Sequence, residues 1–254
     1  MAELHGQLEE HLRSLKLKAM LATYRSFSER AAKSKLSYEE YLALLLEEEV
    51  RARTDQTLQK KINQAKFPYV KPLESFDFSF QPDLPEKELL RLSSLEFLET
   101  KENLIFLGPP GVGKTHLAVS FGLKACMLKH RVLFVTARDL LDDLMLAVKQ
   151  GALTGKLMSY SRLSLLVIDE LGYVPVTKEQ ANVFFQLVSM RYEKGAMILT
   201  SNYGFEDWGQ IFPDPVVASA ILDRLVHHAK IFFIRGSSYR LKDKLKKAER
   251  RKTA

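Results

Sequence analysis

Short apolar runs alternate with longer segments of helical periodicity over most of the chain from residue 86 onward. The apolar runs are NLIFL, RVLFVTA, LSLLVIDE, AMILTSN and KIFFIRG. Between them lie segments such as THLAVSFGLKACMLK, RDLLDDLMLAVKQ and KEQANVFFQLVSMRYEK, in which apolar residues recur at the spacing of one helix face. Strands that are apolar along their whole length are covered on both faces. The pattern therefore predicts an α/β domain with five strands in a parallel sheet flanked by helices.

One predicted helix leads into this sheet, and another joins its last two strands. The first covers about residues 86–99. The second is the first half of ASAILDRLVHHAKIFFIRG, residues 218–236, whose second half is the final strand. Arg224 lies in this helix among apolar residues at helical spacing, namely Ile221, Leu222, Leu225 and Val226. An arginine in this setting, at the end of the domain, is a candidate functional residue.

The first seventy residues show no strand-like alternation and are rich in Leu, Ala, Glu, Lys and Arg, so they are predicted to be helical. One helix should cover about residues 4–32. A second should begin at Ser37, where SYEE is a capping box in which Ser37 caps and Glu40 reaches back. Phe67-Pro68 should end it, because the residue before a proline disfavours helical backbone angles.

The segment FPYVKPLESFDFSFQPDLP contains four prolines and is predicted to be an extended linker. Its residues Phe76, Phe78 and Phe80 alternate with polar residues and would share one face of an extended chain. We therefore divide the chain into a helical domain for DNA or partner binding (1–68), a linker with the lead-in helix (69–96), the α/β domain (97–240) and a basic tail (241–254).

Composition narrows the class of protein. The 254 residues are 46% hydrophobic and 27% charged, which is typical of a soluble globular chain. Cys126 is the only cysteine, which excludes an internal disulfide and fits a reducing compartment. The N-terminus lacks the apolar core of a signal peptide, and no apolar run is long enough to span a bilayer. We expect a cytoplasmic protein without a membrane partner.

The net charge of +7 permits binding to nucleic acid without establishing it. The excess is concentrated in the tail RLKDKLKKAERRK, which has eight lysines and arginines and two acidic residues. Taken alone, this tail is better explained as a solvated terminal helix than as a nucleic-acid contact.

The segment GPPGVGKT matches the P-loop pattern G-x-x-x-x-G-K-[ST] and lies between a predicted strand and a predicted helix, as a P-loop must. Glycines let its backbone approach phosphates, which the N–H groups and the helix N-terminus then bind. Lys114 would reach the β- and γ-phosphates, and Thr115 would ligate Mg²⁺. The alternative is a glycine-rich turn without a ligand. The predicted nucleotide-binding residues are Gly108, Pro109, Pro110, Gly111, Val112, Gly113, Lys114, Thr115 and His116.

Two further strand ends carry candidate catalytic residues. LLVIDE places Asp169 at the carboxyl edge of the sheet, where it would hold Mg²⁺, and Glu170 beside it as general base for the attacking water. A helix-capping role for the two carboxylates is the alternative. ILTSN ends in Asn202, which would orient water against the γ-phosphate unless it is only a turn residue. DELG also fits the D-x-x-G pattern of GTPases, but no N-K-x-D follows, which favours ATP.

Together these segments resemble the Walker A, Walker B and sensor-one motifs of the AAA+ ATPases. VIDELGYVP, ILTSNYGFEDWGQIF, ILDRL and IRGSSYR look specifically like the IstB family of ATP-binding helper proteins of insertion sequences. HLRSLKLKAMLATY and LSYEEYLALLLEEEV are also IstB-like, so the resemblance covers nearly the whole chain. The chain is similar as well to the helicase loader DnaC and, more distantly, to the initiator DnaA. The resemblance implies a sheet order of five-one-four-three-two, a small all-α N-terminal domain, and assembly with ATP on DNA.

The resemblance also assigns two arginines. Arg224 in LDRL matches the arginine finger, which would contact the γ-phosphate of ATP bound to a neighbouring subunit. Without the family match, a surface arginine whose stem packs on its neighbours would explain it. Arg240 in GSSYR matches the position of a sensor arginine of the same subunit. Only fourteen residues follow Arg240, too few for a helical lid domain, which departs from the fuller AAA+ pattern.

The DnaA-like branch carries a helical insertion before Walker B, which here corresponds to RDLLDDLMLAVKQGALTGKLMSYSRL. Polar residues around its glycine-bearing bend would follow a DNA phosphate backbone, namely Lys149, Gln150, Thr154 and Lys156. Lys178, just beyond Walker B, would join them. A solvated charged turn is the alternative for each of them. His227 and His228 lack the company of metal ligands in the sequence, and we interpret them as structural.

The function expected from these motifs is that of an ATP-dependent DNA-binding helper. It would self-assemble on duplex DNA with ATP and Mg²⁺, recruit and activate a transposase, and disassemble on hydrolysis. The alternative is a DnaC-like helicase loader, since both classes share the same ATPase domain. A DNA clamp that uses ATP only for assembly is a third possibility, which the Asp169-Glu170 pair disfavours. A small-molecule P-loop kinase is disfavoured because no acceptor pocket or lid motif is evident.

Overall fold

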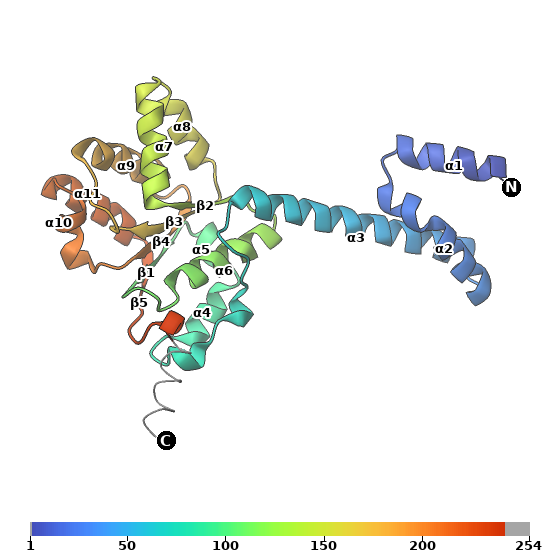
Figure 1. Ribbon diagram of the computed structural model, residues 1–254, viewed down its shortest axis with the longest axis horizontal. Helices are drawn as coiled ribbons and strands as arrows, with labels where there is room; N and C mark the ends of the chain where they lie inside the picture. The colour runs from blue at the N-terminus through green and yellow to red at the C-terminus, as the bar shows by residue number, and fades with distance from the viewer. Residues whose placement is uncertain (1, 242–254) are drawn as a thin grey trace, which may run out of the picture. The chain divides into compact units, whose positions relative to one another are not determined.

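The computed structural model describes residues 2–241, and its contacts divide the chain into two units, Met1–Lys60 and Lys61–Ala254. The first unit holds α1 (Ala2–Ser14), α2 (Lys18–Ser34) and most of α3 (Tyr38–Ala65), as Figure 1 shows. None of the helices in the described part is both long enough and apolar enough to cross a membrane. The predicted domain limits, 1–68, 69–96, 97–240 and 241–254, stay a proposal.

The single helix predicted over residues 4–32 is wrong, because the chain turns between α1 and α2. Lys16 adopts a left-handed backbone angle, φ 58°, and the N–H of Leu17 donates to the carbonyl of Leu12 at 2.9 Å. The turn folds α2 back, so that apolar residues from three helices form one small core, namely Leu12, Met20, Tyr24 and Leu45. Burying this core favours the break over a continuous helix.

The predicted capping box at the start of α3 is confirmed. The Ser37 N–H donates to Glu40 Oε2 at 2.7 Å, and the Glu40 N–H donates to Ser37 Oγ at 3.1 Å. The helix ends at Ala65, just before Phe67-Pro68, as the sequence predicts.

Helix α2 has no capping side chain of its own, because Leu17 stands at its N-cap. Glu49 of α3 takes that place. Its Oε2 accepts the N–H groups of Ala19 at 2.8 Å and Met20 at 3.1 Å, and Arg53 donates to its other oxygen at 2.9 Å. Burial would raise the pKa of Glu49, but these donors outweigh burial and hold the pKa below its usual value.

Replacing Glu49 with alanine is expected to lower the free energy of opening at the start of α2 by about 1–3 kcal/mol, because two N–H groups lose a charged acceptor. Native-state hydrogen exchange at the Ala19 and Met20 amides measures this change. Because folding lowers the pKa of Glu49, its stabilisation is present at neutral pH and is lost as the pH falls below about 4. Glu48→Ala is the matched control, since Glu48 pairs with Arg51 at the surface. Equal effects of both changes would exclude the capping role.

The second unit is a sheet with helices on both faces (Figure 1). Its strands are β1 (Asn103–Leu107), β2 (Val132–Thr136), β3 (Leu165–Leu171), β4 (Ala196–Ser201) and β5 (Ala229–Phe233). Its helices are α4 (Glu86–Leu92), α5 (Glu96–Glu99), α6 (Lys114–Met127), α7 (Ala137–Lys149), α8 (Leu153–Ser161), α9 (Lys178–Arg191), α10 (Trp208–Ile211) and α11 (Pro215–Val226). Single 3-10 turns lie at Leu73–Ser75, Phe78–Phe80, Phe205–Asp207 and Tyr239–Leu241.

The five described strands are parallel and follow the order β2-β3-β4-β1-β5, which confirms the predicted fold class and the sheet order that the resemblance implies. Alternate residues of each strand face opposite layers. On β1, Ile105 and Leu107 join the core formed with α7, α9 and α11, whereas Phe106 stacks on Phe121 of α6 with ring centroids 6.2 Å apart. The sheet therefore presents its carboxyl edge, with the P-loop after β1, between two packed layers.

Two predictions for the segment before the sheet are wrong. The lead-in helix is broken into α4 and α5, with Leu95 in the left-handed region at φ 63°, and the break lets Leu92, Phe97 and Leu98 all be buried. The linker is not extended, because 3-10 turns occupy part of it. Phe78 and Phe80 belong to one of these 3-10 turns, so the three phenylalanines do not form a strand-like face, and Phe76 is buried.

Candidate functional site

A cavity of about 730 Å³ opens at the carboxyl edge of the sheet. Four segments line it: linker residues within 69–81, residues 110–116 of the P-loop and α6, the ends of β3 and β4, and the pair Tyr239 and Arg240. Its size lies within the range of pockets that bind nucleotide-sized ligands. Of the predicted nucleotide-binding residues, those from Pro110 to His116 and Arg240 line the cavity. Gly108 and Pro109 do not line the cavity, but their carbonyl groups accept hydrogen bonds from Lys114.

The P-loop glycines are required by two close contacts. Gly111 and Gly113 have φ angles of 86° and 105°, which side chains disfavour. A Cβ atom on Gly111 would lie 2.1 Å from Ser238 Oγ, and one on Gly113 would lie 2.7 Å from a ring carbon of Phe76. From the sequence, we expected these glycines to let the backbone approach phosphate groups. The structure adds that two remote segments pack directly on the loop.

Lys114 is the buried cation of the cavity. Its Nζ donates to the carbonyls of Gly108 at 2.7 Å and Pro109 at 2.8 Å, and to Asn202 Oδ1 at 2.7 Å. Burial lowers the pKa of Lys114 to about 8, while the charges of Asp169 and Glu170 act in the opposite direction. A direct hydrogen bond between Lys114 and Asn202 thus joins the P-loop to the end of β4.

Asp169 is buried at the end of β3 and accepts two hydroxyl groups. Thr115 Oγ1 lies 3.0 and 3.1 Å from its two carboxylate oxygens, and Thr200 Oγ1 donates to Oδ1 at 2.5 Å. Burial raises the pKa of Asp169, and the two hydroxyl donors oppose that rise. The predicted metal ligands Thr115 and Asp169 therefore lie together, as a set of hard oxygen atoms that suits Mg²⁺.

Glu170 is exposed and lines the cavity, next to the buried Asp169. Its backbone is left-handed, φ 61°, and its N–H donates to Thr200 Oγ1 at 3.0 Å. Thr200 thus bridges both acidic residues, a role that the sequence analysis missed. The available signal was its position near the end of the fourth apolar run, two residues before Asn202.

The linker forms a wall of the cavity that the sequence analysis missed, and the segment after β5, in which only Arg240 was predicted to take part, forms another. His116 Nε2 lies 3.2 Å from Ser75 Oγ, and the His116 ring meets the edge of Phe76 at 5.2 Å. Burial lowers the pKa of His116. On the other side, the Tyr239 N–H donates to the carbonyl of Gly111 at 2.9 Å. The linker has no recognisable binding motif, because its contribution depends on tertiary contacts.

The two candidate arginines lie in different places. Arg240 is exposed and lines the cavity, and its charge contributes to the lowered pKa of Lys114. Arg224 is half-buried on α11, where Nη1 donates to the Ala220 carbonyl at 3.0 Å and the guanidinium lies 4.7 Å from the ring centre of Phe185. Among the residues that the structure describes around the cavity, Arg224 is not a lining residue.

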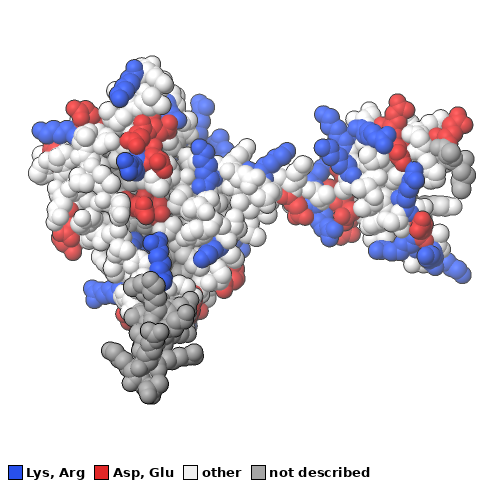
Figure 2. Space-filling model, viewed as in Figure 1, with Lys and Arg blue, Asp and Glu red and all other residues white. Residues whose placement is uncertain are grey.

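The predicted DNA-contacting lysines are divided between elements. Lys149 ends α7 and is exposed, and Lys156 lies on the neighbouring α8, where its Nζ pairs with Asp143 at 2.7 Å. Lys178 begins α9. On the face seen in Figure 2, basic and acidic side chains are interspersed over the described residues. The basic tail predicted at 241–254 lies almost wholly outside the described residues.

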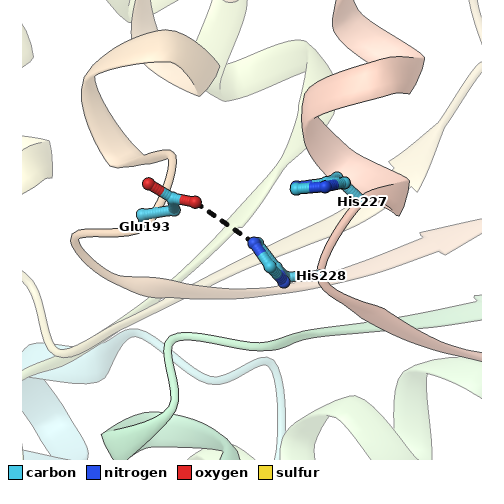
Figure 3. A group of neighbouring side chains, drawn as sticks. All are labelled: Glu193, His227 and His228. Carbon is cyan, nitrogen blue, oxygen red and sulfur yellow. Dashed lines mark hydrogen bonds and ion pairs between the residues drawn. The ribbon is translucent and has the colours of Figure 1, made fainter.

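We expected no further metal-ligand residue near His227 and His228, and this expectation is wrong. Folding brings Glu193 beside them from the end of α9, and Figure 3 shows the three side chains converging. His228 Nε2 lies 3.1 Å from Glu193 Oε1. The sequence does not indicate that the three side chains are neighbours, because Glu193 follows α9 and the two histidines follow α11.

Comparison with known proteins gives a family match over most of the chain. The model of the IstB-like ATP binding proteins matches residues 10–247. A protein described as an ATP-binding protein of insertion sequence IS21 from Pseudomonas aeruginosa is 46% identical over 240 residues, covering 94% of this chain and 91% of the relative. One from insertion sequence IS5376 of Geobacillus stearothermophilus is 40% identical, covering 97% of this chain and 98% of the relative.

Solved structures share the fold of the second unit. DnaA from Aquifex aeolicus, bound to AMPPCP, superposes with a TM-score of 0.57 at 23% identity, covering 72% of this chain and 56% of the DnaA chain. DnaI superposes with a TM-score of 0.55 at 20% identity, covering 70% of this chain and 94% of the DnaI chain. At these identities the likeness concerns the fold alone.

Proposed function

Because the chain belongs to the family of IstB-like ATP-binding proteins, we propose that it is an ATPase that assembles on duplex DNA and activates a transposase. Hydrolysis of ATP then disassembles the complex. One observation carries the proposal: the cavity gathers Lys114, Thr115 and Glu170, while Arg224 is held outside it on α11. A site with this composition is completed by a second copy of the chain. We place this activity in the cytoplasm.

ATP with Mg²⁺ fits the cavity. Lys114 supplies a cation for the phosphates, and Thr115 and Asp169 supply oxygen ligands within 3.1 Å of each other. The N–H groups at the start of α6 face the same phosphates. When bound, Mg²⁺ would offset negative charge on the β- and γ-phosphates. The bond between Lys114 and Asn202 couples the phosphates to the end of β4, which is the proposed sensing role of Asn202.

Glu170 is the proposed general base. Its carboxylate borders the cavity without a described bond to Lys114, so it can accept a proton from water that attacks the γ-phosphate. Thr200 holds the backbone of Glu170 and the carboxylate of Asp169 through one hydroxyl group. This shared contact fixes the spacing between the metal ligand and the base.

Arg224 is proposed to act in trans, on ATP bound by a neighbouring copy. Its guanidinium lies over the ring of Phe185 and donates to the Ala220 carbonyl, which holds it at the surface of α11. A guanidinium placed there can stabilise charge that spreads over the transferred phosphate. Arg240 would contact phosphate within its own subunit, since it lines the cavity.

The DNA contacts are proposed to be electrostatic and independent of sequence. Lys149, Lys156 and Lys178 are the candidate residues, and the ion pair between Lys156 and Asp143 must open for Lys156 to take part. Helicase loading is the second candidate function, because the solved structure of the DnaC helicase loader shares the fold, with a TM-score of 0.50 at 22% identity. The relatives described as insertion-sequence proteins favour the transposase as partner.

A pull-down experiment tests the choice of partner. With Mg-ATP and duplex DNA, the chain is expected to be retained by its cognate transposase and not by a replicative helicase of the same host. Lys114→Ala is the control, because loss of the phosphate-binding cation should abolish retention. Retention by the helicase in preference to the transposase would establish the loader function instead.

A further inference from the structure

Three side chains at one end of the second unit are arranged as a set of metal ligands. His227 caps α11 and is followed by His228, while Glu193 comes from the turn after α9 (Figure 3). One ligand atom of each residue lies within 4.8 Å of the other two. The rings of His227 and His228 are 4.1 Å apart, and His228 Nε2 already contacts Glu193 Oε1. From this geometry we propose that the three residues bind a divalent transition-metal ion such as Zn²⁺.

The ligand types fit that class of ion. Two imidazole nitrogens and one carboxylate oxygen favour Zn²⁺ and its neighbours over Mg²⁺ or Ca²⁺, which prefer oxygen ligands. In a tetrahedral zinc site, bonds of about 2.0–2.2 Å place ligand atoms roughly 3.3–3.6 Å apart. All three side chains are exposed, so small rotations can close the remaining distance. Water would fill the fourth position.

A neighbouring residue orients one ligand. The Tyr192 hydroxyl lies 2.8 Å from His227 Nδ1, which leaves Nε2 of that ring for the metal. His227 also stands at the C-terminal end of α11, where the helix dipole favours a positive charge, so the position suits an added cation.

The site would join the ends of α9 and α11. Arg224 lies one turn before His227, and Phe185, which contacts the guanidinium, belongs to α9. A bound ion would thus fix the two helices that support Arg224. This last step rests on the proposed function, whereas binding of the ion does not.

Titration of the full-length chain with Co²⁺ alone, followed by its visible absorption, tests the site directly. One Co²⁺ per chain is expected in a site of low coordination number, and Zn²⁺ should displace it. His227→Ala and His228→Ala should each weaken binding by roughly tenfold or more, and Tyr192→Phe should weaken it less. His11→Ala is the matched control, because His11 is an exposed histidine on α1 outside the cluster. Circular dichroism confirms that each variant is folded.

Hydrogen exchange gives a second readout that does not depend on ATP. The His227 N–H donates to the Asp223 carbonyl at 3.0 Å in the last turn of α11, and Zn²⁺ should slow its exchange in the wild type but not in His228→Ala. Absence of one-to-one binding, or equal affinity in the wild type and both histidine variants, would overturn the proposal. That failure would leave the ATPase proposal untouched, since turnover is measured separately.

Discussion

With Glu170 replaced by glutamine, ATP hydrolysis is expected to slow by about 10²–10⁴-fold, because an amide cannot accept the proton of the attacking water. Binding of ATP should be retained. The cation and oxygen ligands of the cavity come from Lys114, Thr115 and Asp169, none of which is changed. The bond from the backbone of residue 170 to Thr200 is also retained, since it uses the main-chain N–H.

Single-turnover measurement of phosphate release, beside equilibrium dialysis with ATP, separates the two effects. Glu179→Gln serves as the control, because Glu179 is an exposed acidic residue in the first turn of α9 and does not line the cavity. If Glu170→Gln hydrolyses ATP at the wild-type rate, Glu170 is not the general base. The clamp hypothesis, in which ATP serves only assembly, would instead be supported if the wild type and the variant both bound ATP without hydrolysing it.

Replacing Arg224 with alanine is expected to reduce DNA-stimulated hydrolysis by about 10³–10⁵-fold, the range found for arginines that act on a neighbour's phosphate. Each chain should still bind ATP, because Arg224 is not among the described residues that line its own cavity. Ordered assembly on duplex DNA, observed by electron microscopy, should be lost. Arg131→Ala is the control, since Arg131 is exposed at the opposite, amino edge of the sheet, just before β2.

Mixing the two inactive variants distinguishes action in trans from action in cis. In a mixed assembly, about a quarter of the interfaces combine an intact Glu170 from one chain with an intact Arg224 from the next, if the variants assort freely. Hydrolysis should therefore reappear on mixing Glu170→Gln with Arg224→Ala. A mixture as inactive as its components would show that Arg224 does not complete a neighbour's site.

The sheet was predictable from the sequence because its strands are buried on both faces. NLIFL forms β1 within its predicted limits, and each of the other four apolar runs holds a strand to within one residue. The P-loop and the Asp169-Glu170 pair follow such runs, so their place at one edge could be deduced from parallel pairing alone. The periodicity of apolar residues does not predict the order of the strands in the sheet. The predicted order came from the resemblance to a family.

The errors lie where tertiary contacts override local pattern. Lys16 and Leu95 are left-handed without being glycine, so no residue type signalled the breaks in the two predicted helices. Burial of Met20 and Phe97 on either side of those turns supplies the reason. Thr200 escaped notice for a related cause, because its role depends on two residues of another strand.

The packing on the P-loop also links nucleotide binding to folding. Gly113 contacts Phe76 and Gly111 contacts Ser238, so the loop is bounded by segments far apart in the chain. Its final shape requires contacts of high sequence separation, which form late and at a large cost in loop entropy. A ligand that binds only the folded loop also stabilises the segments that pack on it. At a ligand concentration of a hundred times its Kd, the free energy of unfolding rises by about 2.7 kcal/mol. ATP would in this sense act as a structural component of the entire second unit as well as its substrate.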